Sequence, residues 1–203
     1  MCFIRAVINA ITGGRYLLQI FSYIYLPQLK TMFFKSILLL LFCVAILNCG
    51  FCQQYTVPQN VQLHGKEDYI KYESDIIATA NWLEVTPVGN DDAKRKQANT
   101  FLMQWVTGSS TVNVNVNADF IGKLCDKNPD LLMMFMAGYT RNALQNNYDT
   151  SSFNGNLAGV KGVIMLYKLG GKIQKNRFVL SAIHAMDQGK LENWVKANMD
   201  KTQ

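Results

Sequence analysis

The chain is poor in the residues that metal and disulfide chemistry require. It has 203 residues but only two histidines, His64 and His184, and five cysteines, four of which precede residue 53. Cys125 is therefore the only cysteine in the rest of the chain. A single cysteine forms neither an internal disulfide nor a multi-cysteine metal site, and two histidines argue against a histidine-based one. We expect no metal and no other cofactor.

Motifs for nucleotide binding and hydrolysis are missing as well. Gly155 and Gly159 are not followed by the Gly-Lys-Ser/Thr of a phosphate-binding loop. Ser181, His184 and Asp187 are the residue types of a hydrolytic triad, but on one helix they spread over about 120° of its surface. The members of a working triad converge from different elements, with the base reaching both partners. We predict no catalytic residue, and an enzyme is the less expected interpretation.

The excess of positive charge is confined to the start of the chain. The formal net charge is +6, from 20 Lys and Arg and 14 Asp and Glu. Four of the basic residues and none of the acidic ones precede residue 53, which leaves 16 basic against 14 acidic residues and a net charge of +2. So small an excess does not indicate nucleic-acid binding. The one dense basic run, Lys94-Arg95-Lys96, predicts a solvated helix face, with a phosphate or lipid headgroup contact as the alternative.

Residues 32–52 have the three parts of a secretory signal. Lys35 supplies the positive charge, an apolar run of residues 36–47 follows, and Gly50 and Cys52 are small residues at the −3 and −1 positions of a cleavage site. We expect cleavage between Cys52 and Gln53, and hence a periplasmic or secreted protein. Since a signal that begins at Met32 is complete, residues 1–31 are expected to be an upstream extension from a mis-assigned start.

Two alternatives keep the protein at a membrane. An uncleaved leader would act as an anchor, although an apolar run this short followed by polar sequence favours cleavage. Lipidation at Cys49 or Cys52 would also tether the chain. Asn48 and Phe51 precede these cysteines, where a lipidation signal has a small residue.

Residues 53–203 are expected to form a single all-α domain, a compact bundle of about five to seven helices. Its centre is the helix predicted at about residues 129–145, which is apolar almost all the way round and therefore needs partners on several sides. Asn128 as N-cap and Pro129 as first helical residue mark its start. Apolar residues three and four positions apart predict the other helices; these span about residues 66–83, 93–106, 118–126, 154–169, 175–187 and 191–199. Ser74 and Asp75 either break the first of these segments into two helices or face solvent.

Two sets of residues indicate close packing in this bundle. Gly155, Gly159 and Gly162 lie near the start of the helix that follows the central one, where they allow a neighbouring helix to approach, at a cost of about 1 kcal/mol each relative to alanine. The methionines of the central helix are expected to fill gaps in the core, with a plastic binding surface as the alternative.

Residues 112–117 alternate strictly between valine and asparagine. A period of two predicts a short, half-buried strand, and a lone strand needs a partner for its backbone. We predict that Val112, Val114 and Val116 form an interaction edge, which pairs with the same segment of a second molecule or with the arm at residues 56–63. An extended loop that lies across the helices is the alternative.

A rival interpretation starts from the acidic side chains of the first helical segment. Paired carboxylates with aromatic walls would suit a small-molecule pocket or a hydrolytic enzyme. A solvated helix face is the simpler explanation. The acids concerned are Glu67, Asp68, Glu73, Asp75 and Glu84.

Four short stretches occur together in the second part of the chain: Trp82-Leu83-Glu84 with Thr86-Pro87, Phe101-Leu102 with Trp105 to Ser109, Asn128 to Leu131, and Gly155 to Gly159. In this combination they resemble small exported bacterial proteins without an assigned function. The resemblance covers most of residues 55–197 and implies export and a helical fold, but no catalytic residues. Because the sequence shows an ordinary core and no convergent polar constellation, we expect a binding or assembly protein of the cell envelope, whose partner is an envelope protein or another copy of itself.

Overall fold

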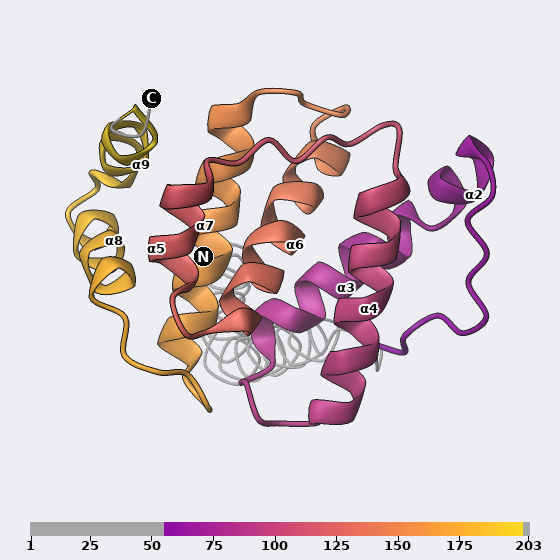
Figure 1. Cartoon of the computed structure of the whole chain (residues 1–203), viewed down its shortest axis with the longest axis horizontal. Helices are drawn as coiled ribbons and strands as arrows, with labels where there is room; N and C mark the ends of the chain where they lie inside the picture. The colour runs from indigo at the N-terminus through magenta and orange to yellow at the C-terminus, as the bar shows by residue number, and fades with distance from the viewer. Residues whose placement is uncertain (1–54, 201–203) are drawn as a thin grey trace, which may run out of the picture. The chain divides into compact units, whose positions relative to one another are not determined.

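The computed structural model describes residues 55–200, and these residues form an all-α domain, as predicted. Eight helices follow one another in this range (Figure 1), and its one β contact is an isolated bridge between Val88 and Gly171. The helices are α2 (Lys66–Lys71), α3 (Glu73–Val85), α4 (Asp92–Gly108), α5 (Ala118–Cys125), α6 (Pro129–Gln145), α7 (Ser152–Leu169), α8 (Arg177–Asp187) and α9 (Leu191–Asp200).

The helix count exceeds the predicted five to seven because the first predicted helix is divided at Tyr72. This residue ends α2 and begins α3, with φ −96° and ψ 4° instead of helical angles. Its ring packs edge-on against Phe101 of α4, with ring centroids 6.0 Å apart. The break between α2 and α3 therefore coincides with a contact between Tyr72 and α4, and the spacing of apolar residues alone does not locate it.

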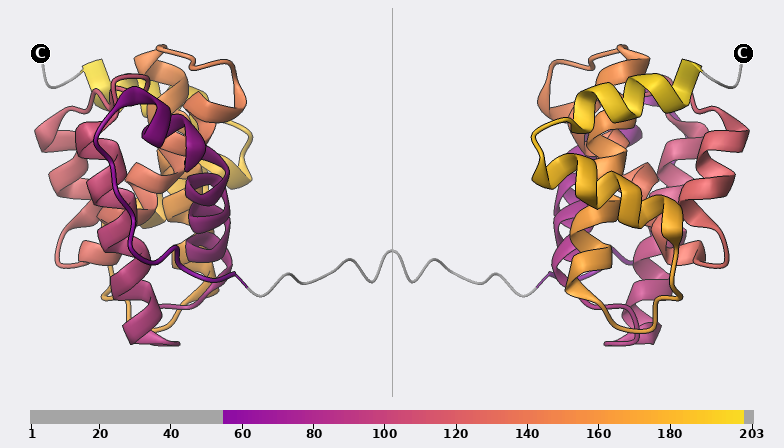
Figure 2. Two further views of the ribbon diagram at one scale, coloured as in Figure 1. Left: turned by 90° about the vertical axis from the view of Figure 1, so that its right-hand side faces the viewer. Right: turned by 90° about the vertical axis from the view of Figure 1, so that its left-hand side faces the viewer.

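Helix α6 is the centre of the domain, as its all-round apolar sequence predicts. Buried side chains occur along it from Leu131 to Ala143. Helices α7 and α3 make its most extensive contacts, and α4 and α5 also pack on it (Figure 1). Helices α8 and α9 lie against α7 on the side away from α6 (Figure 2), so the bundle has an inner core helix and an outer layer.

Glycines allow α6 and α7 to approach closely. A Cβ added to Gly155 would lie 2.3 Å from the ring of Tyr139, and one added to Gly159 would lie 2.6 Å from the ring of Phe135. Gly138 makes the reverse contact, since its added Cβ would lie 2.8 Å from the carbonyl oxygen of Ala158. These distances leave no room for a side chain at the glycine positions, and the rings of Tyr139 and Phe135 fill the space beside Gly155 and Gly159.

Asn128 stands at the N-cap position of α6, but its side chain does not cap the helix. Its Nδ2 donates to the carbonyl oxygen of Gln174 at 3.1 Å, and its Oδ1 accepts from the Gln174 N–H at 2.7 Å. The predicted N-cap position is confirmed, but the side chain makes no capping hydrogen bond. Asn128 joins the start of α6 to the loop before α8, a contact between residues far apart in the sequence.

The valine–asparagine repeat is an extended loop and not a strand, so the predicted strand is wrong and the alternative holds. Residues 112–117 cross one end of the bundle between α4 and α5 (Figure 1). Val112 is buried at 4 % exposure, whereas Val116 is 36 % exposed. Within the described range, the arm at residues 56–63 forms no backbone hydrogen bond with this loop. At the start of the arm, the Tyr55 hydroxyl lies 2.8 Å from the Thr79 hydroxyl of α3.

The predicted signal lies outside the described residues. This applies to residues 1–31, to the cleavage site at Cys52 and Gln53, and to the lipidation candidate Cys49. Among residues 55–200, no helix is both long enough and apolar enough to cross a membrane.

Candidate functional site

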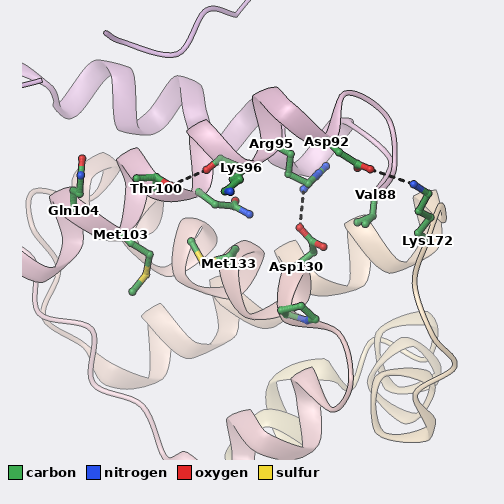
Figure 3. Close-up of a pocket in the computed structure, with 12 residues that line it drawn as sticks. Val88, Asp92, Arg95, Lys96, Thr100, Met103, Gln104, Asp130, Met133 and Lys172 are labelled. Atoms are coloured by element: carbon green, nitrogen blue, oxygen red, sulfur yellow. Dashed lines mark hydrogen bonds and ion pairs between the residues drawn. The ribbon is translucent and has the colours of Figure 1, made fainter. Parts of the chain in front are cut away.

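The candidate site is a groove of about 720 Å³ between α4 and the first turns of α6. Figure 3 shows its lining side chains, which come from both helices and from Val88 and Lys172 at one end. The parallel bridge between Val88 and Gly171 holds that end together, and the Lys172 N–H donates to the Val88 carbonyl oxygen at 2.8 Å. We refer to this surface as the α4–α6 groove.

Arg95 lies at the base of the groove and is buried, with 3 % exposure. The predicted solvated basic face is therefore wrong for this residue. Helical spacing places Arg95 on the same face of α4 as Ala98 and Leu102, which are core residues. Its guanidinium lies over the Trp82 ring, 5.6 Å from the centroid, and its Nη2 donates to the carbonyl oxygen of Thr86.

Several polar atoms at the base of the groove have no hydrogen-bond partner among the described residues. They are Nε and Nη1 of Arg95 and Oδ1 of Asn99, one turn further along α4. Burial lowers the pKa of Arg95, an effect that the nearby Asp130 opposes. Buried polar atoms without a partner are costly and uncommon in folded proteins, and they often mark sites of function.

The charges around the groove are almost balanced. Asp130 of α6 lies 3.9 Å from Arg95 Nη1, and Asp92 of α4 lies 3.1 Å from Lys172 Nζ (Figure 3). Lys96 is exposed and forms no ion pair with any residue in the range 55–200. The groove therefore presents one positive charge in excess, at the side chain of Lys96.

Two methionines supply the apolar wall. Met103 of α4 is 38 % exposed, and Met133 of α6 is half-buried (Figure 3). The core role predicted for the methionines of α6 applies fully to Met134, which is completely buried. Met103 was not predicted to line a site, although its position between the core residues Leu102 and Trp105, and off the buried face of the helix, is a signal that could have identified it.

Comparisons with known proteins do not assign this chain to a family. No protein-family model matches the chain, and neither curated proteins nor solved structures produce a match. The resemblance to small exported bacterial proteins thus stays a sequence-based expectation.

The triad-like residues of α8 do not come together. His184 is exposed, and its Nε2 lies 2.8 Å from the Gln188 side-chain amide. The Ser181 hydroxyl donates to the carbonyl oxygen of Phe178, and Asp187 pairs with Lys168 of α7 at 2.9 Å. Each residue therefore has a separate local partner, as expected from their angular spread on one helix.

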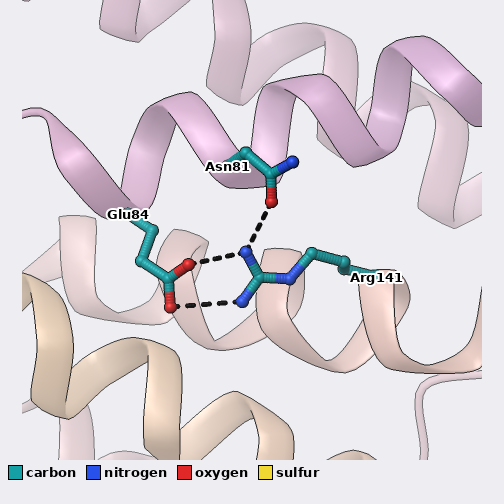
Figure 4. Close-up of polar contacts among 3 residues, drawn as sticks. All are labelled: Asn81, Glu84 and Arg141. Carbon is teal, nitrogen blue, oxygen red and sulfur yellow. Dashed lines mark hydrogen bonds and ion pairs between the residues drawn. The ribbon is translucent and has the colours of Figure 1, made fainter. Parts of the chain in front are cut away.

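Three of the five acids of the first helical segment have structural partners, and none of the five lines the α4–α6 groove. Asp68 accepts from the backbone N–H groups of His64 and Gly65, which lowers its pKa. Glu73 accepts from the Tyr148 hydroxyl at 3.0 Å. Glu84 forms a two-pronged pair with Arg141 of α6 (Figure 4). The part of the chain that the structure describes also holds no cluster of three or more metal-ligating side chains.

Proposed function

We propose that this protein is an exported binding protein of the cell envelope, whose ligand lies in the α4–α6 groove. The observation that carries the proposal is the combination, in one hollow, of two accessible methionines with the positive charge of Lys96, which has no ion pair among residues 55–200. Ligand sites are typically hollows of about 300–1,000 Å³ with apolar walls and a few placed polar groups. The groove has this size and this mixture.

The ligand that fits this surface is an amphiphile with one anionic group. Met103 and Met133 offer contact to an apolar chain, because methionine side chains adapt to irregular apolar partners. Asp92 and Asp130 are each within 4 Å of a cation, so Lys96 is the lining charge that lacks a counter-ion in the described chain. An alkyl carboxylate matches both features.

Binding of decanoate, measured by titration calorimetry, tests this function. We expect saturable binding of one decanoate per chain. Met103→Glu should weaken it at least tenfold, because the substitution replaces apolar surface with a repelling charge. Met165→Glu is the matched control, since Met165 is 48 % exposed on α7 and does not line the groove. Absence of saturable binding to the wild type, or equal loss in both variants, would reject the groove as the site.

Export is part of the proposal and has its own test. The composition of residues 32–52 supports it, with a basic residue, an apolar run and small residues before Gln53. The intact mass of the native protein from separated cell fractions should correspond to a chain that begins at Gln53. A membrane-bound species that retains residues 32–52, or a mass increase of lipid size on Cys49 or Cys52, would contradict it.

A further inference from the structure

A second hollow, of about 400 Å³, lies beside the α4–α6 groove, between α4 and the arm that precedes α2. We refer to it as the arm hollow. Lys96, Thr100 and Gln104 line both hollows, and because they are four positions apart they form one stripe along α4 (Figure 3). At about 100° per residue, Met103 lies on one side of this stripe, in the groove, and Gln97 lies on the other, in the arm hollow. The two hollows are therefore neighbours across a single row of side chains.

The arm is held on the bundle and forms a fixed wall of the arm hollow. Val57 is buried at 4 % exposure, and Gln59 Nε2 donates to its carbonyl oxygen at 3.0 Å. At the start of the arm, the centroid of the Tyr55 ring lies 5.4 Å from that of the Trp82 ring of α3, and 5.3 Å from Lys94 Nζ of α4. The arm is thus anchored to two helices. Binding in this hollow does not have to order the arm first, which reduces its entropic cost.

The arm hollow is polar but almost uncharged. Lys96 is the one charged side chain among its described lining residues. The other polar side chains are four carboxamides and one hydroxyl, from Gln59, Asn60, Gln97, Gln104 and Thr100. The carboxamides of Asn60, Gln97 and Gln104 have no hydrogen-bond partner within residues 55–200. Since a carboxamide has two N–H donors and a carbonyl acceptor, these three side chains suit a neutral ligand group that both donates and accepts.

A ligand that fills both hollows has three different parts that meet near Lys96. Its apolar chain lies against Met103 and Met133 in the groove, its anionic group pairs with the Lys96 ammonium, and its neutral polar group enters the arm hollow. An N-acyl amino acid has this shape, because its acylated nitrogen, its carboxylate and its side chain all diverge from one carbon atom. A primary amide in the side chain matches the carboxamides of the arm hollow, since each amide can donate to the other and accept from it.

We propose that the ligand is an N-acyl amino acid with an uncharged amide side chain, which occupies the arm hollow while the acyl chain occupies the α4–α6 groove. This inference rests on the function proposed above for the groove, and it adds the chemistry of the headgroup and the residues that select it. Gln97 and Asn60 determine the headgroup specificity, because they line the arm hollow and not the groove. Gln104 lines both hollows, so its carboxamide can contact either part of the ligand.

Titration calorimetry of the intact protein with three ligands tests the headgroup. They are N-decanoyl-L-glutamine, N-decanoyl-L-norvaline, in which a methyl group replaces the carboxamide, and decanoate. The glutamine conjugate should bind at least about fivefold more tightly than the norvaline conjugate, as expected for the gain of one net hydrogen bond. Equal affinities of the two conjugates, with decanoate still bound, would overturn the headgroup assignment and leave the groove function intact. Failure of all three ligands to bind would reject the groove function and this inference with it.

Two substitutions then place the headgroup in the arm hollow. Gln97→Leu should weaken binding of N-decanoyl-L-glutamine at least about fivefold and leave decanoate within about twofold. Asn60→Gly should act in the same direction, and glycine keeps the left-handed backbone of this position, where φ is 53°. Gln145→Leu is the matched control, because Gln145 is exposed at the end of α6 and lines neither hollow. Unchanged binding of the glutamine conjugate in both arm-hollow variants, or equal weakening of both ligands, would overturn the proposal.

Discussion

Arg141 of α6 and Glu84 of α3 are joined by two hydrogen bonds, one of 2.6 Å from Nη1 to Oε2 and one of 3.1 Å from Nη2 to Oε1 (Figure 4). Arg141 Nη1 also donates to Asn81 Oδ1 at 2.7 Å. Both charged side chains are only 19 % exposed. The pair therefore links the central helix to α3 at a partly buried position, where an ionic contact of good geometry is stronger than on the open surface.

Loss of this pair should destabilise the fold. Glu84→Ala is expected to lower the free energy of unfolding by about 1–3 kcal/mol, because Arg141 would lose its charge-assisted partner while staying largely buried. Asp187→Ala breaks the exposed pair with Lys168 and should cost no more than about 1 kcal/mol. Urea denaturation of both variants measures the difference, and equal costs would show that burial of the first pair is irrelevant to stability.

The contact between α6 and α7 should tolerate no added methyl group. Gly159→Ala places its Cβ 2.6 Å from the Phe135 ring and 2.9 Å from the Phe135 carbonyl oxygen. We expect a loss of about 1–3 kcal/mol from overpacking. Gly122→Ala is the control, since an added Cβ in α5 meets nothing within 4 Å. There, the higher helix propensity of alanine should stabilise the protein by up to about 1 kcal/mol. Thermal unfolding of the two variants should therefore shift in opposite directions.

Cys125 should be an unreactive thiol in the folded protein. Burial raises its pKa to about 12, whereas an unfolded cysteine titrates at about 8.5. At pH 8, alkylation of the Cys125 peptide by iodoacetamide should be at least about a hundredfold slower in the native protein than in urea. Similar rates would show that the thiol is accessible and readily ionised.

The same raised pKa predicts an effect of pH on stability. A group that ionises less readily in the folded state favours folding below its unfolded pKa, and that contribution is lost as the pH rises toward the folded value. For Cys125 the affected range is about pH 8.5 to 12. Cys125→Ala should flatten the alkaline decline of the unfolding free energy, measured against the wild type from pH 8 upward. An unchanged slope would contradict the assignment.

Lys96 should determine the charge preference of the groove. Lys96→Gln is expected to weaken decanoate binding about tenfold, which corresponds to about 1.4 kcal/mol. It should leave the binding of decanol unchanged, because the alcohol makes no ionic contact. Lys161→Gln removes an exposed lysine of α7 outside the groove and serves as control. Equal affinities of the wild type for decanoate and decanol would exclude an anion preference while leaving the groove itself intact.

Most of the helices could be predicted from the sequence because their signals are local. The central helix occupies residues 129–145 as predicted, since Pro129 suits a first turn and the apolar residues that follow form an uninterrupted helical pattern. Asp91, an acidic residue just before the predicted start of α4, caps this helix by accepting from the Lys94 N–H at 3.2 Å. Caps, prolines and apolar periods act over one or two turns, so neighbours in sequence are sufficient to identify them.

The candidate site could not be predicted, because its residues depend on contacts between distant helices. Arg95 belongs to a run of three basic residues that sequence rules place in solvent. In the fold, the Trp82 ring, the Thr86 carbonyl and Asp130 of α6 surround its guanidinium and make its burial possible. The groove exists only because α4 and the start of α6 lie side by side, and nothing in either segment encodes the other.

The Val–Asn repeat shows, within a single segment, both what local sequence predicts and what contacts between distant segments decide. Its period of two determined that residues 112–117 are extended and that valine and asparagine occupy opposite faces. Whether the segment forms a strand was decided by tertiary structure. Tyr139 and Asn156, from two different helices, satisfy the backbone of Asn115 and so replace a neighbouring strand. The sequence by itself determined the helices and the extended conformation of this loop through short-range sterics and apolar spacing, while packing between distant segments decided which polar groups are buried, which are paired and which remain free.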